Sequence, residues 1–305
     1  MLQAQSKRYG ERAIKWLLAL CAALSVLTTT AIILSLLGPT VGFFEIVPAS
    51  EFFFSVDWTP QFEPPSFGVL GIVLGTLNVV LWAMLFAIPL GLAAAVYLSE
   101  YASPRARKII KPALEVLVGI PTVAIGFFAV SFILPHVIVP LWPGEFLGGA
   151  EGKPFMALAA SLGIALMIVP IIASLSDDAM RAVPRGLHEG AYALGATKAK
   201  VATRVVFPAA LSGIVASIVL AISRAVGETM IVVIAGGSTP KFTLNPAESI
   251  QAMTSYIATT ATGDIGVGTT DYKSIFAVGA LLFVITLIMN VVSIRLVRRY
   301  REVYE

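Results

Sequence analysis

Residues 189–213 read EGAYALGATKAKVATRVVFPAALSG and lie between two long apolar spans. The segment is polar and carries three basic residues, a glycine at 195 and a proline at 208. Glycine permits a close turn and proline starts or bends a helix. The pattern therefore predicts a helix, a tight turn and a second helix lying across the face of a membrane. Such a rigid element suits a membrane protein that accepts work from a soluble motor; the alternative is an ordinary solvated loop.

The composition is that of a chain embedded in lipid. Of the 305 residues, 57% are hydrophobic and 13% are charged, and the mean hydropathy is +0.88. Soluble domains average about a quarter charged residues, so a soluble enzyme or binding domain is excluded. Cys21 is the single cysteine of this sequence, which leaves no intrachain disulfide and no metal site built from several thiolates.

Six segments are long enough to cross a bilayer, which requires about 20 mainly apolar residues. They are residues 16–37, 71–98, 114–142, 155–175, 213–235 and 275–294. The predicted fold class is an all-α integral membrane protein with six transmembrane helices. The third segment contains Gly119 and Pro121, and proline removes a backbone donor. We expect a broken helix there, surrounded by other helices, because lipid does not tolerate irregular backbone.

The basic residues follow these spans. With both termini on the cytoplasmic side, 17 of the 21 Lys and Arg residues fall on inside segments and three on outside segments. This bias follows the positive-inside rule and predicts a multi-pass protein of a bacterial or archaeal cell (inner) membrane with both termini cytoplasmic. The first span has 22 residues, more than the 7–15 of a signal-peptide core, so we expect it to remain as a helix.

Two outside segments have recognisable patterns. Residues 38–67 are rich in Phe, Pro and acidic residues, which indicates an aromatic loop at the membrane interface. Residues 245–248 read NPAE, a combination typical of a helix start. Because Ile250, Met253 and Ile257 then share one face, a short amphipathic helix is predicted on the outer surface.

The polar segment resembles the EAA signature of the permease subunits of ATP-binding-cassette (ABC) importers. That signature is Glu-Ala-Ala, three residues, Gly, nine residues, Ile, one residue and Leu-Pro. The matching positions here are Glu189, Ala191, Gly195 and Pro208, while Gly190, Val205 and Phe207 depart from the family's residues. The resemblance implies a type I ABC importer (MetI-like) permease fold, with residues 177–213 as the EAA coupling loop that inserts into a cleft of an ATPase subunit.

An arginine lies in the middle of the fifth span. Arg224 is about eleven residues from either end of that segment, and a charge at that depth costs at least ~2.5 kcal/mol. Glu228 follows four residues later, which in a continuous helix places it one turn away on the same face. One interpretation is an ion pair that holds helices together. The other is a translocation pathway in which Arg224 meets an anion, because a guanidinium presents a planar fork of donors, and Glu228 tunes or gates that contact.

A narrower resemblance concerns the cargo. The run AISRAVGETM at 221–230, the run MTSYIA at 253–258, the run YLSEYA at 97–102 and the ending RRYRE at 298–302 are similar to the C-type permease subunit of the bacterial phosphate-specific (Pst) importer, with the A-type subunit as a rival. The resemblance implies an ATP-driven phosphate importer. Its expected partners are a second, A-type permease, an ATPase dimer, an extracytoplasmic phosphate-binding protein, phosphate and membrane lipid, with no nucleic acid.

The expected division of the chain follows from these assignments. Residues 1–67 form the cytoplasmic N-terminus, first helix and outer loop, residues 68–296 the permease core, and residues 297–305 a cytoplasmic tail. No phosphate-binding nucleotide loop of the form G-x-x-x-x-G-K-[ST] occurs in the sequence. We therefore expect no enzymatic activity, no bound cofactor or metal, and ATP-Mg on the partner ATPase.

Two alternatives remain open at this stage. A buried arginine does not choose among tetrahedral anions, so sulfate or molybdate is a possible cargo. A secondary anion transporter or a channel that works without ATP is an alternative of another class, although such a protein has no reason to carry an EAA loop.

Overall fold

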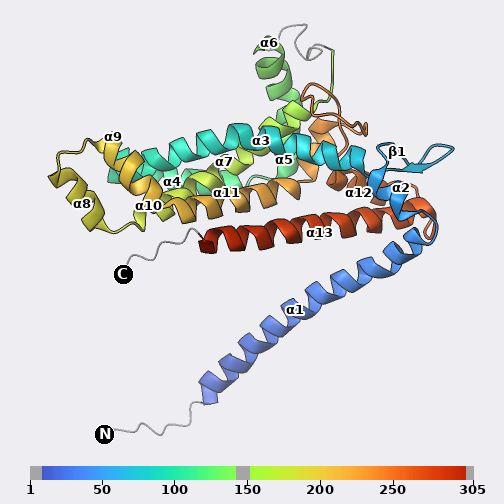
Figure 1. Cartoon of the computed structure of the whole chain (residues 1–305), viewed down its shortest axis with the longest axis horizontal. Helices are drawn as coiled ribbons and strands as arrows, with labels where there is room; N and C mark the ends of the chain where they lie inside the picture. The colour runs from blue at the N-terminus through green and yellow to red at the C-terminus, as the bar shows by residue number, and fades with distance from the viewer. Residues whose placement is uncertain (1–8, 142–151, 300–305) are drawn as a thin grey trace.

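The computed structural model describes residues 9–141 and 152–299. It shows a bundle of long helices with a short helical segment across one end (Figure 1). The N-terminal residues 1–8, the connection 142–151 and the end of the expected tail, 300–305, lie outside the described residues. The fold class is the predicted one, an all-α membrane protein.

The elements follow one another along the chain with two short strands among the helices. They are α1 Tyr9–Phe44, α2 Ala49–Phe54, β1 Trp58–Thr59, β2 Ser66–Phe67, α3 Leu70–Val96, the π-helix η1 Tyr97–Tyr101, α4 Pro104–Val118, α5 Thr122–Phe128, the π-helix η2 Ala129–Ile138, α6 Val139–Leu141, α7 Ala157–Arg181, α8 Arg185–Ala193, α9 Lys198–Val201, the π-helix η4 Ala202–Val206, α10 Phe207–Ala209, α11 Leu211–Val226, the π-helix η5 Val232–Gly236, α12 Met253–Ala261 and α13 Thr270–Arg299. The strands β1 and β2 pair antiparallel.

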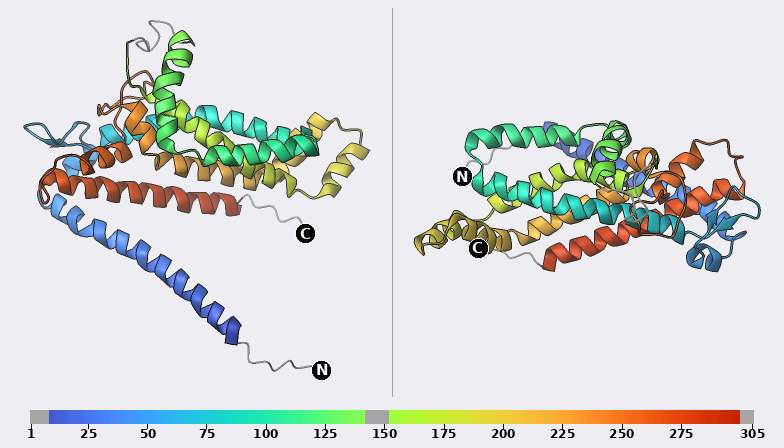
Figure 2. Two further views of the ribbon diagram at one scale, coloured as in Figure 1. Left: turned by 180° about the vertical axis from the view of Figure 1, so that it is seen from behind. Right: turned by 90° about the horizontal axis from the view of Figure 1, so that it is seen from above.

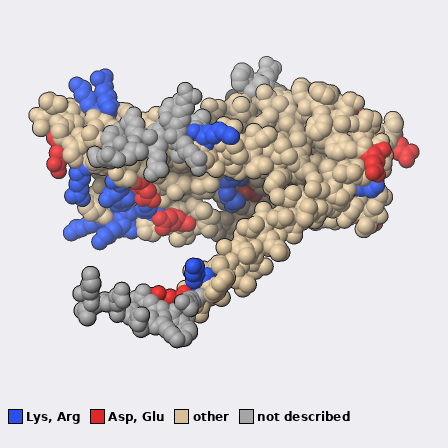
Figure 3. All heavy atoms as spheres, turned by 60° about the horizontal axis from the view of Figure 1, so that its bottom comes forward, with Lys and Arg blue, Asp and Glu red and all other residues tan. Residues whose placement is uncertain are grey.

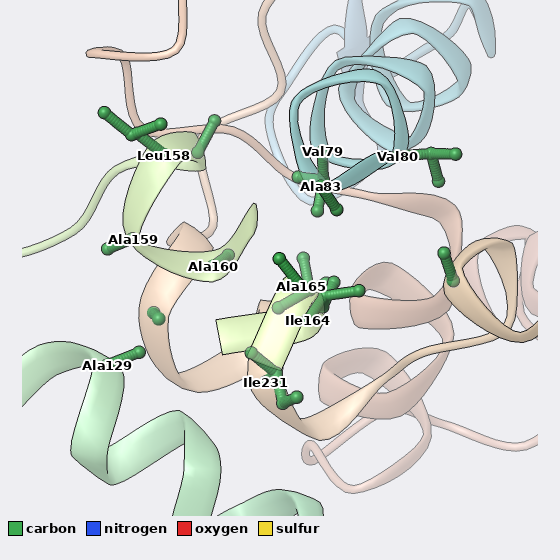
Figure 4. Close-up of a cluster of buried hydrophobic side chains, with 14 of the residues drawn as sticks. Val79, Val80, Ala83, Ala129, Leu158, Ala159, Ala160, Ile164, Ala165 and Ile231 are labelled. Carbon is green, nitrogen blue, oxygen red and sulfur yellow. The ribbon is translucent and has the colours of Figure 1, made fainter. Parts of the chain in front are cut away.

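Helix α7 is the centre of the bundle. In its most apolar window, 67% of the residues are buried, against none in the corresponding window of α1. Figure 4 shows Ile164 and Ala165 of α7 between Val79 and Ala83 of α3 on one side and Ile231 on the other. This apolar core fixes the relative positions of α3, α7, α11 and η5.

Helices α7 and α11 approach closely. A side chain at Gly213 would place its Cβ against the Cβ of Ala179, and the Ser176 and Ser217 hydroxyls are 2.7 Å apart in a buried hydrogen bond. Small residues at an interface between membrane helices allow backbones to pack tightly. The start of α11 is therefore held against the last turns of α7.

Within residues 9–141 and 152–299, five helices are long and apolar enough to cross a membrane, and a bent pair, Lys198–Ala209 with Leu211–Val226, provides a sixth. The helix predicted over the third segment is broken, as expected, at residues 119–121. Its predicted position, 114–142, is partly wrong, because residues 114–118 belong to the amphipathic helix α4 and the apolar crossing begins at Thr122. Only one face of α5 and η2 is buried, and this part turns away from the bundle axis (Figures 1 and 2).

The fifth crossing differs more from the prediction of a continuous helix over 213–235. Helix α11 ends at Val226, residue Gly227 caps it, and helical structure resumes at Met230. Glycine does not favour helix continuation. The prediction that Arg224 and Glu228 lie one turn apart on the same helical face is therefore wrong.

Helix α1 is retained as a helix, as expected, and lies at the periphery of the bundle. It contacts α13 near one end and diverges from it along its length (Figure 2). Its apolar side chains are exposed in the isolated chain, among them Trp16 and Leu20.

Residues 38–67 do not form the predicted interfacial loop. The first of them continue α1, and the rest fold into α2, β1 and β2 around a buried aromatic cluster. Phe43, Phe52, Trp58 and Tyr256 of this cluster are at most 2% exposed, and the rings of Trp58 and Tyr256 meet edge to face with centroids 4.8 Å apart. Phe43, Phe52 and Phe67 therefore join this segment to α12 and α13, whereas Phe53, Phe54 and Phe62 remain exposed.

The amphipathic helix of the same end starts later than predicted. Asn245 Oδ1 accepts a hydrogen bond from the Ala247 backbone N–H at 3.0 Å, which forms a local turn, since Asn side chains compete with helix formation in this way. Helix α12 begins at Met253, where Ser255 bonds the Ala252 backbone. Ile250 and Met253 are buried, so the segment is packed into the end of the bundle.

The charges divide the molecule along the bundle axis. Most Lys and Arg side chains in view lie toward one end, a few lie near the middle, and the opposite end carries mainly acidic side chains (Figure 3). We call the end that carries the start of α4, the end of α7 and α8 to α10 the basic end. This distribution is the one that the positive-inside pattern predicts.

Candidate docking segment and translocation site

Residues 185–209, named here the docking segment, comprise α8, α9, η4 and α10 and lie at the basic end of the bundle (Figure 1). Pro184 precedes α8 with an extended backbone. The helix, turn and helix predicted from the EAA pattern are all present. Glu189, Ala191 and Gly195 belong to the first helix and its turn, and Pro208 lies in the final helical turn.

The turn after α8 has the hydrogen bonds of a Schellman motif. The Gly195 N–H donates to the Tyr192 carbonyl at 2.9 Å and the Ala196 N–H donates to the Ala191 carbonyl at 3.1 Å. Gly195 has φ +77°, a left-handed conformation in which a Cβ is unfavourable. The glycine of the signature is therefore required by the geometry of the turn.

Apolar side chains hold the docking segment against the bundle. Val201 and Val206 are fully buried and pack in one cluster with Met180 of α7, Ala95 of α3 and Ile214 of α11. Ala191 and Ala196 pack against the same cluster. The small residue at 191 thus allows α8 to lie close to the end of the bundle.

The opposite side of the docking segment is exposed. Leu194, at the turn, is 90% exposed and Tyr192 is 44% exposed, and Glu189 is also exposed. An exposed leucine beside a rigid turn is a suitable contact for an apolar cleft of another protein. Glu189 has no ion-pair partner among the described residues.

Two contacts from η1 hold the docking segment, and the sequence did not reveal their role. Glu100 Oε1 is 3.5 Å from His188 Nε2, and Lys198 Nζ lies 5.1 Å from the centre of the Tyr101 ring. The first contact fixes α8 and the second fixes α9. The sequence signal was present in the run at 97–102, an acid and a tyrosine directly after an apolar span, but the partners of these two residues lie 88 and 97 positions later in the chain.

The chain bends by 72° between the docking segment and α11. The bend follows Pro208 at Ala210, whose carbonyl accepts from the backbone N–H groups of Gly213 and Ile214 at 3.0 Å. Proline at the start of a helical turn matches its fixed φ. Pro208 therefore separates a segment lying across the bundle end from a helix running into the bundle.

Arg224 lies in the last turn of α11, exposed in the isolated chain. It is thirteen residues beyond Leu211, which begins α11, so at about 1.5 Å per residue it is roughly 20 Å from the basic end. One guanidinium nitrogen is 3.5 Å from the Met167 sulfur of α7. No carboxylate pairs with Arg224 in residues 9–141 and 152–299.

Glu228 is 4% exposed. Its Oε1 accepts a hydrogen bond from the Ile231 backbone N–H at 3.4 Å, and its backbone carbonyl accepts from Thr254 Oγ1 at 2.8 Å. A carboxylate in this position caps a helix start and complements its dipole. The structure thus separates the two residues that the sequence paired. Glu228 fixes η5 to α12, and its carboxylate does not pair with Arg224.

A second charged cluster lies at the basic end. Arg107 of α4 bonds the fully buried carboxylate of Asp177 of α7 at 2.6 Å, and Lys111 bonds Asp178. These charge-assisted bonds join α4 to α7. Sequence reasoning missed the cluster, although bases at 105–111 and acids at 177–178 were both visible at the ends of spans.

Together, the crossing helices, the docking segment and the arginine at membrane depth define a membrane permease that works with a soluble partner. Comparison with known proteins gives the family. Residues 87–302 match the family of binding-protein-dependent transport system inner membrane components. The chain belongs to this family, and is a membrane component of an ABC importer whose ATPase is a separate subunit.

Curated relatives cover most of the chain. It is 30% identical over 296 residues to the probable ABC transporter permease protein YqgH of Bacillus subtilis, covering 96% of this chain and 92% of the relative. It is 32% identical over 259 residues to the phosphate transport system permease protein PstC of Mesorhizobium japonicum, covering 80% and 76%. For the phosphate transport system permease protein PstC 1 of Mycobacterium tuberculosis the identity is 34% over 249 residues, covering 76% and 73%.

Solved structures have the same fold. A bacterial alginate ABC transporter in complex with a periplasmic protein matches with a TM-score of 0.65 at 17% identity, covering 96% of this chain and 98% of the other. The MetNI methionine ABC transporter in an inward-facing conformation matches with a TM-score of 0.55 at 19% identity, covering 77% and 95%. The fold is therefore the MetI-like permease fold that the EAA resemblance implied.

Proposed function

We propose that this chain forms, together with a second permease subunit, the translocation pathway of an ATP-driven phosphate importer. The importer class follows from the family, and relatives named as phosphate transport permeases support phosphate as the cargo. The single observation in the molecule that carries the proposal is Arg224, a cation inside a membrane crossing without a carboxylate partner among the described residues.

The position of Arg224 suits an anion pathway. A cation at this depth is unfavourable in lipid, so the exposed face of α11 must be covered by protein or line a polar passage in the membrane. A guanidinium in such a passage binds a tetrahedral oxyanion through two N–H donors. In this proposal, Glu228 acts by fixing the start of η5, the helical segment that follows the arginine in the chain.

The docking segment transmits the work of the ATPase. Its buried side anchors it to α3, α7 and α11, and its other side presents Leu194 and Tyr192. Movement of a partner bound to this side reaches α11 through the bend after Pro208. The proposed partners are an ATPase dimer that binds ATP-Mg, an A-type permease and an extracytoplasmic phosphate-binding protein; this chain itself holds no cofactor.

The proposed orientation follows from the charges. The basic end faces the cytoplasm, which places both termini there, and the end formed by α2, β1, β2 and α12 faces outward. The positive-inside rule supports this assignment, as does the position of the docking segment, because ATP is available in the cytoplasm.

Uptake of labelled phosphate by cells that carry the complete importer tests the proposal. Arg224→Ala is expected to reduce uptake by at least about tenfold, because an anion loses its charged partner, while the assembled complex is recovered in the same amount. Arg105→Ala, which removes an exposed cation of α4, is the matched control and is expected to leave uptake unchanged. Normal uptake by the Arg224→Ala importer would contradict the pathway role.

The same assay separates the alternatives. Excess unlabelled phosphate is expected to suppress uptake, whereas stronger suppression by sulfate or molybdate would assign another oxyanion. Uptake that continues without the ATPase subunit would instead indicate an ATP-independent transporter or channel.

A further inference from the structure

A cavity at the basic end has the charges of an anion site. Its volume is about 520 Å³ and it is lined by Arg107, Lys108, Lys111 and Glu115 of α4, by Arg181 at the end of α7, and by Ala102, Pro104 and Pro112. Four cations and one carboxylate face it. This cavity is distinct from Arg224, which lies in the last turn of α11, roughly 20 Å from the basic end.

Two of the cations are fixed in position. Asp177 is fully buried and holds Arg107 at 2.6 Å, and its other contact, to Lys111, is 3.6 Å. Lys111 also bonds Asp178. These bonds neutralise Arg107 and Lys111 in part and keep their side chains against α7, so they form the wall of the cavity.

The other two cations are available. Lys108 and Arg181 are exposed, and neither has an ion-pair partner in the part of the chain that the structure describes. They come from different helices, and α4 and α7 are joined beside them by the Arg107–Asp177 bond. Two unpaired cations on helices that are held together at a junction are suited to the several oxygens of a phosphate group.

The rest of the cavity lining restricts the classes of ligand that fit. Ala102, Pro104 and Pro112 provide an apolar surface beside the cations, and α4 is the amphipathic helix at the basic end. Basic pockets between membrane helices on the cytoplasmic side bind anionic lipid head groups. A free phosphate ion offers the same oxygens without an acyl chain.

We infer that this cavity binds a phosphate group, supplied by an anionic phospholipid or by inorganic phosphate, through Lys108 and Arg181. Glu115 lies one helical turn beyond Lys111 and opposes binding. Arg181 also lines the neighbouring cavity against His188 and Glu189. The bound group therefore contacts the end of α7 directly beside the docking segment.

The test uses the full chain in phosphatidylcholine nanodiscs. In one arm, phosphatidylglycerol is added and the bound lipid is counted by native mass spectrometry. In the other, labelled inorganic phosphate is measured by equilibrium dialysis with the chain carrying Arg224→Ala, so that the proposed pathway site does not contribute. Phosphate uptake by the complete importer and probe binding to the cavity are separate measurements. A variant that loses one and keeps the other therefore distinguishes a failure of the proposed function from a failure of this inference.

The double variant Lys108→Gln with Arg181→Gln is expected to bind one of the two probes with an affinity lower by on the order of tenfold. Each cation near an anionic group contributes substantially to its binding. Arg105→Gln with Lys200→Gln, which removes two exposed charges outside the cavity, is the matched control and is expected to leave binding unchanged. Glu115→Gln is expected to strengthen binding. The arm that responds identifies the source of the phosphate group.

Three results would overturn the inference. The first is that both probes bind to the variant Lys108→Gln with Arg181→Gln as well as to the wild type. The second is that the control variant loses as much binding as this variant does. The third is that Glu115→Gln weakens binding. The charge-conserving pair Lys108→Arg with Arg181→Lys guards against a folding defect, because it is expected to bind within about threefold of the wild type, and failure of this variant while correctly folded would also contradict the inference.

Discussion

Glu100 Oε1 lies 3.5 Å from His188 Nε2, so the π-helix at the end of α3 holds the first helix of the docking segment. The Glu100 side chain is 8% exposed and the His188 side chain 23%. A contact so largely removed from water is stronger than a surface pair. The contact makes the orientation of α8 depend on α3, which packs against the central helix α7.

Removal of this contact is expected to loosen α8. His188→Ala or Glu100→Gln lowers the free energy of local opening by about 1 kcal/mol, which is roughly a fivefold increase in amide exchange. Hydrogen–deuterium exchange of the peptide that contains residues 185–193 measures the effect. His136→Ala, which removes the other histidine, is the control, and unchanged exchange in both test variants would show that the contact does not hold α8.

Gly195 and Gly190 are expected to respond in opposite ways to alanine. Gly195 has φ +77°, so Gly195→Ala costs about 1 kcal/mol. Gly190 lies inside α8 with no heavy atom within 4 Å of an added Cβ, so Gly190→Ala stabilises α8 by about 0.5–1 kcal/mol. Retention of the ATPase through purification is expected to fall for the first variant and to be kept by the second. Equal retention would contradict a docking role for the turn.

Gly213→Val tests the contact between α11 and α7. The added Cβ meets the Cβ of Ala179, and overpacking of this kind costs about 1–3 kcal/mol. Thermal unfolding of the detergent-solubilised protein reports the loss. The second substitution Ala179→Gly makes room and is expected to restore part of it; additive losses in the double variant would place the strain elsewhere.

Glu248 gives the outer end a dependence on pH. A hydrogen bond from Lys241, together with the charges of Lys241 and Lys153, holds the pKa of Glu248 below its ordinary value of 4.5. The folded protein therefore binds this proton less readily than the unfolded chain. The stabilisation is complete above the unfolded pKa and is lost as the pH falls through the lower folded pKa.

Acid titration of stability checks this sign. Between pH 7 and pH values below 4.5, the wild type is expected to lose more stability than Glu248→Gln, whose side chain does not titrate. Glu63→Gln, at an exposed position of the same end, is expected to behave like the wild type. A larger acid loss in Glu248→Gln than in the wild type would reverse the assignment.

Much of the architecture was predictable because it depends on local chemistry. The lengths of the apolar runs predicted the crossings, the proline at 121 predicted the break in the third, and the spacing of Glu189, Gly195 and Pro208 predicted the docking segment. The segregation of Lys and Arg predicted the basic end. Each of these features depends on residues close together in the sequence.

The errors concern features that depend on distant partners or on a single break. Gly227 ends α11 and separates Arg224 from Glu228, although the apolar pattern continues across it. The phenylalanines of 38–67 are typical of an interface, yet Phe43, Phe52 and Phe67 are buried because α12 and α13 provide Tyr256 and Val278 as partners. Neither the Glu100–His188 contact nor the Arg107–Asp177 bond has a signature within one segment.

The break at residues 119–121 separates the amphipathic helix α4 from the third crossing, and the two parts have different attachments. Helix α4 is tied to the end of α7 by ion pairs, whereas α5 and η2 contact the middle of α7 and η5 through apolar side chains. Charge substitutions therefore act on α4 and leave the apolar contacts of α5 in place. The stretch from α4 to η2 thus has two independent attachments to the bundle, one sensitive to changes of charge and the other to changes of side-chain volume.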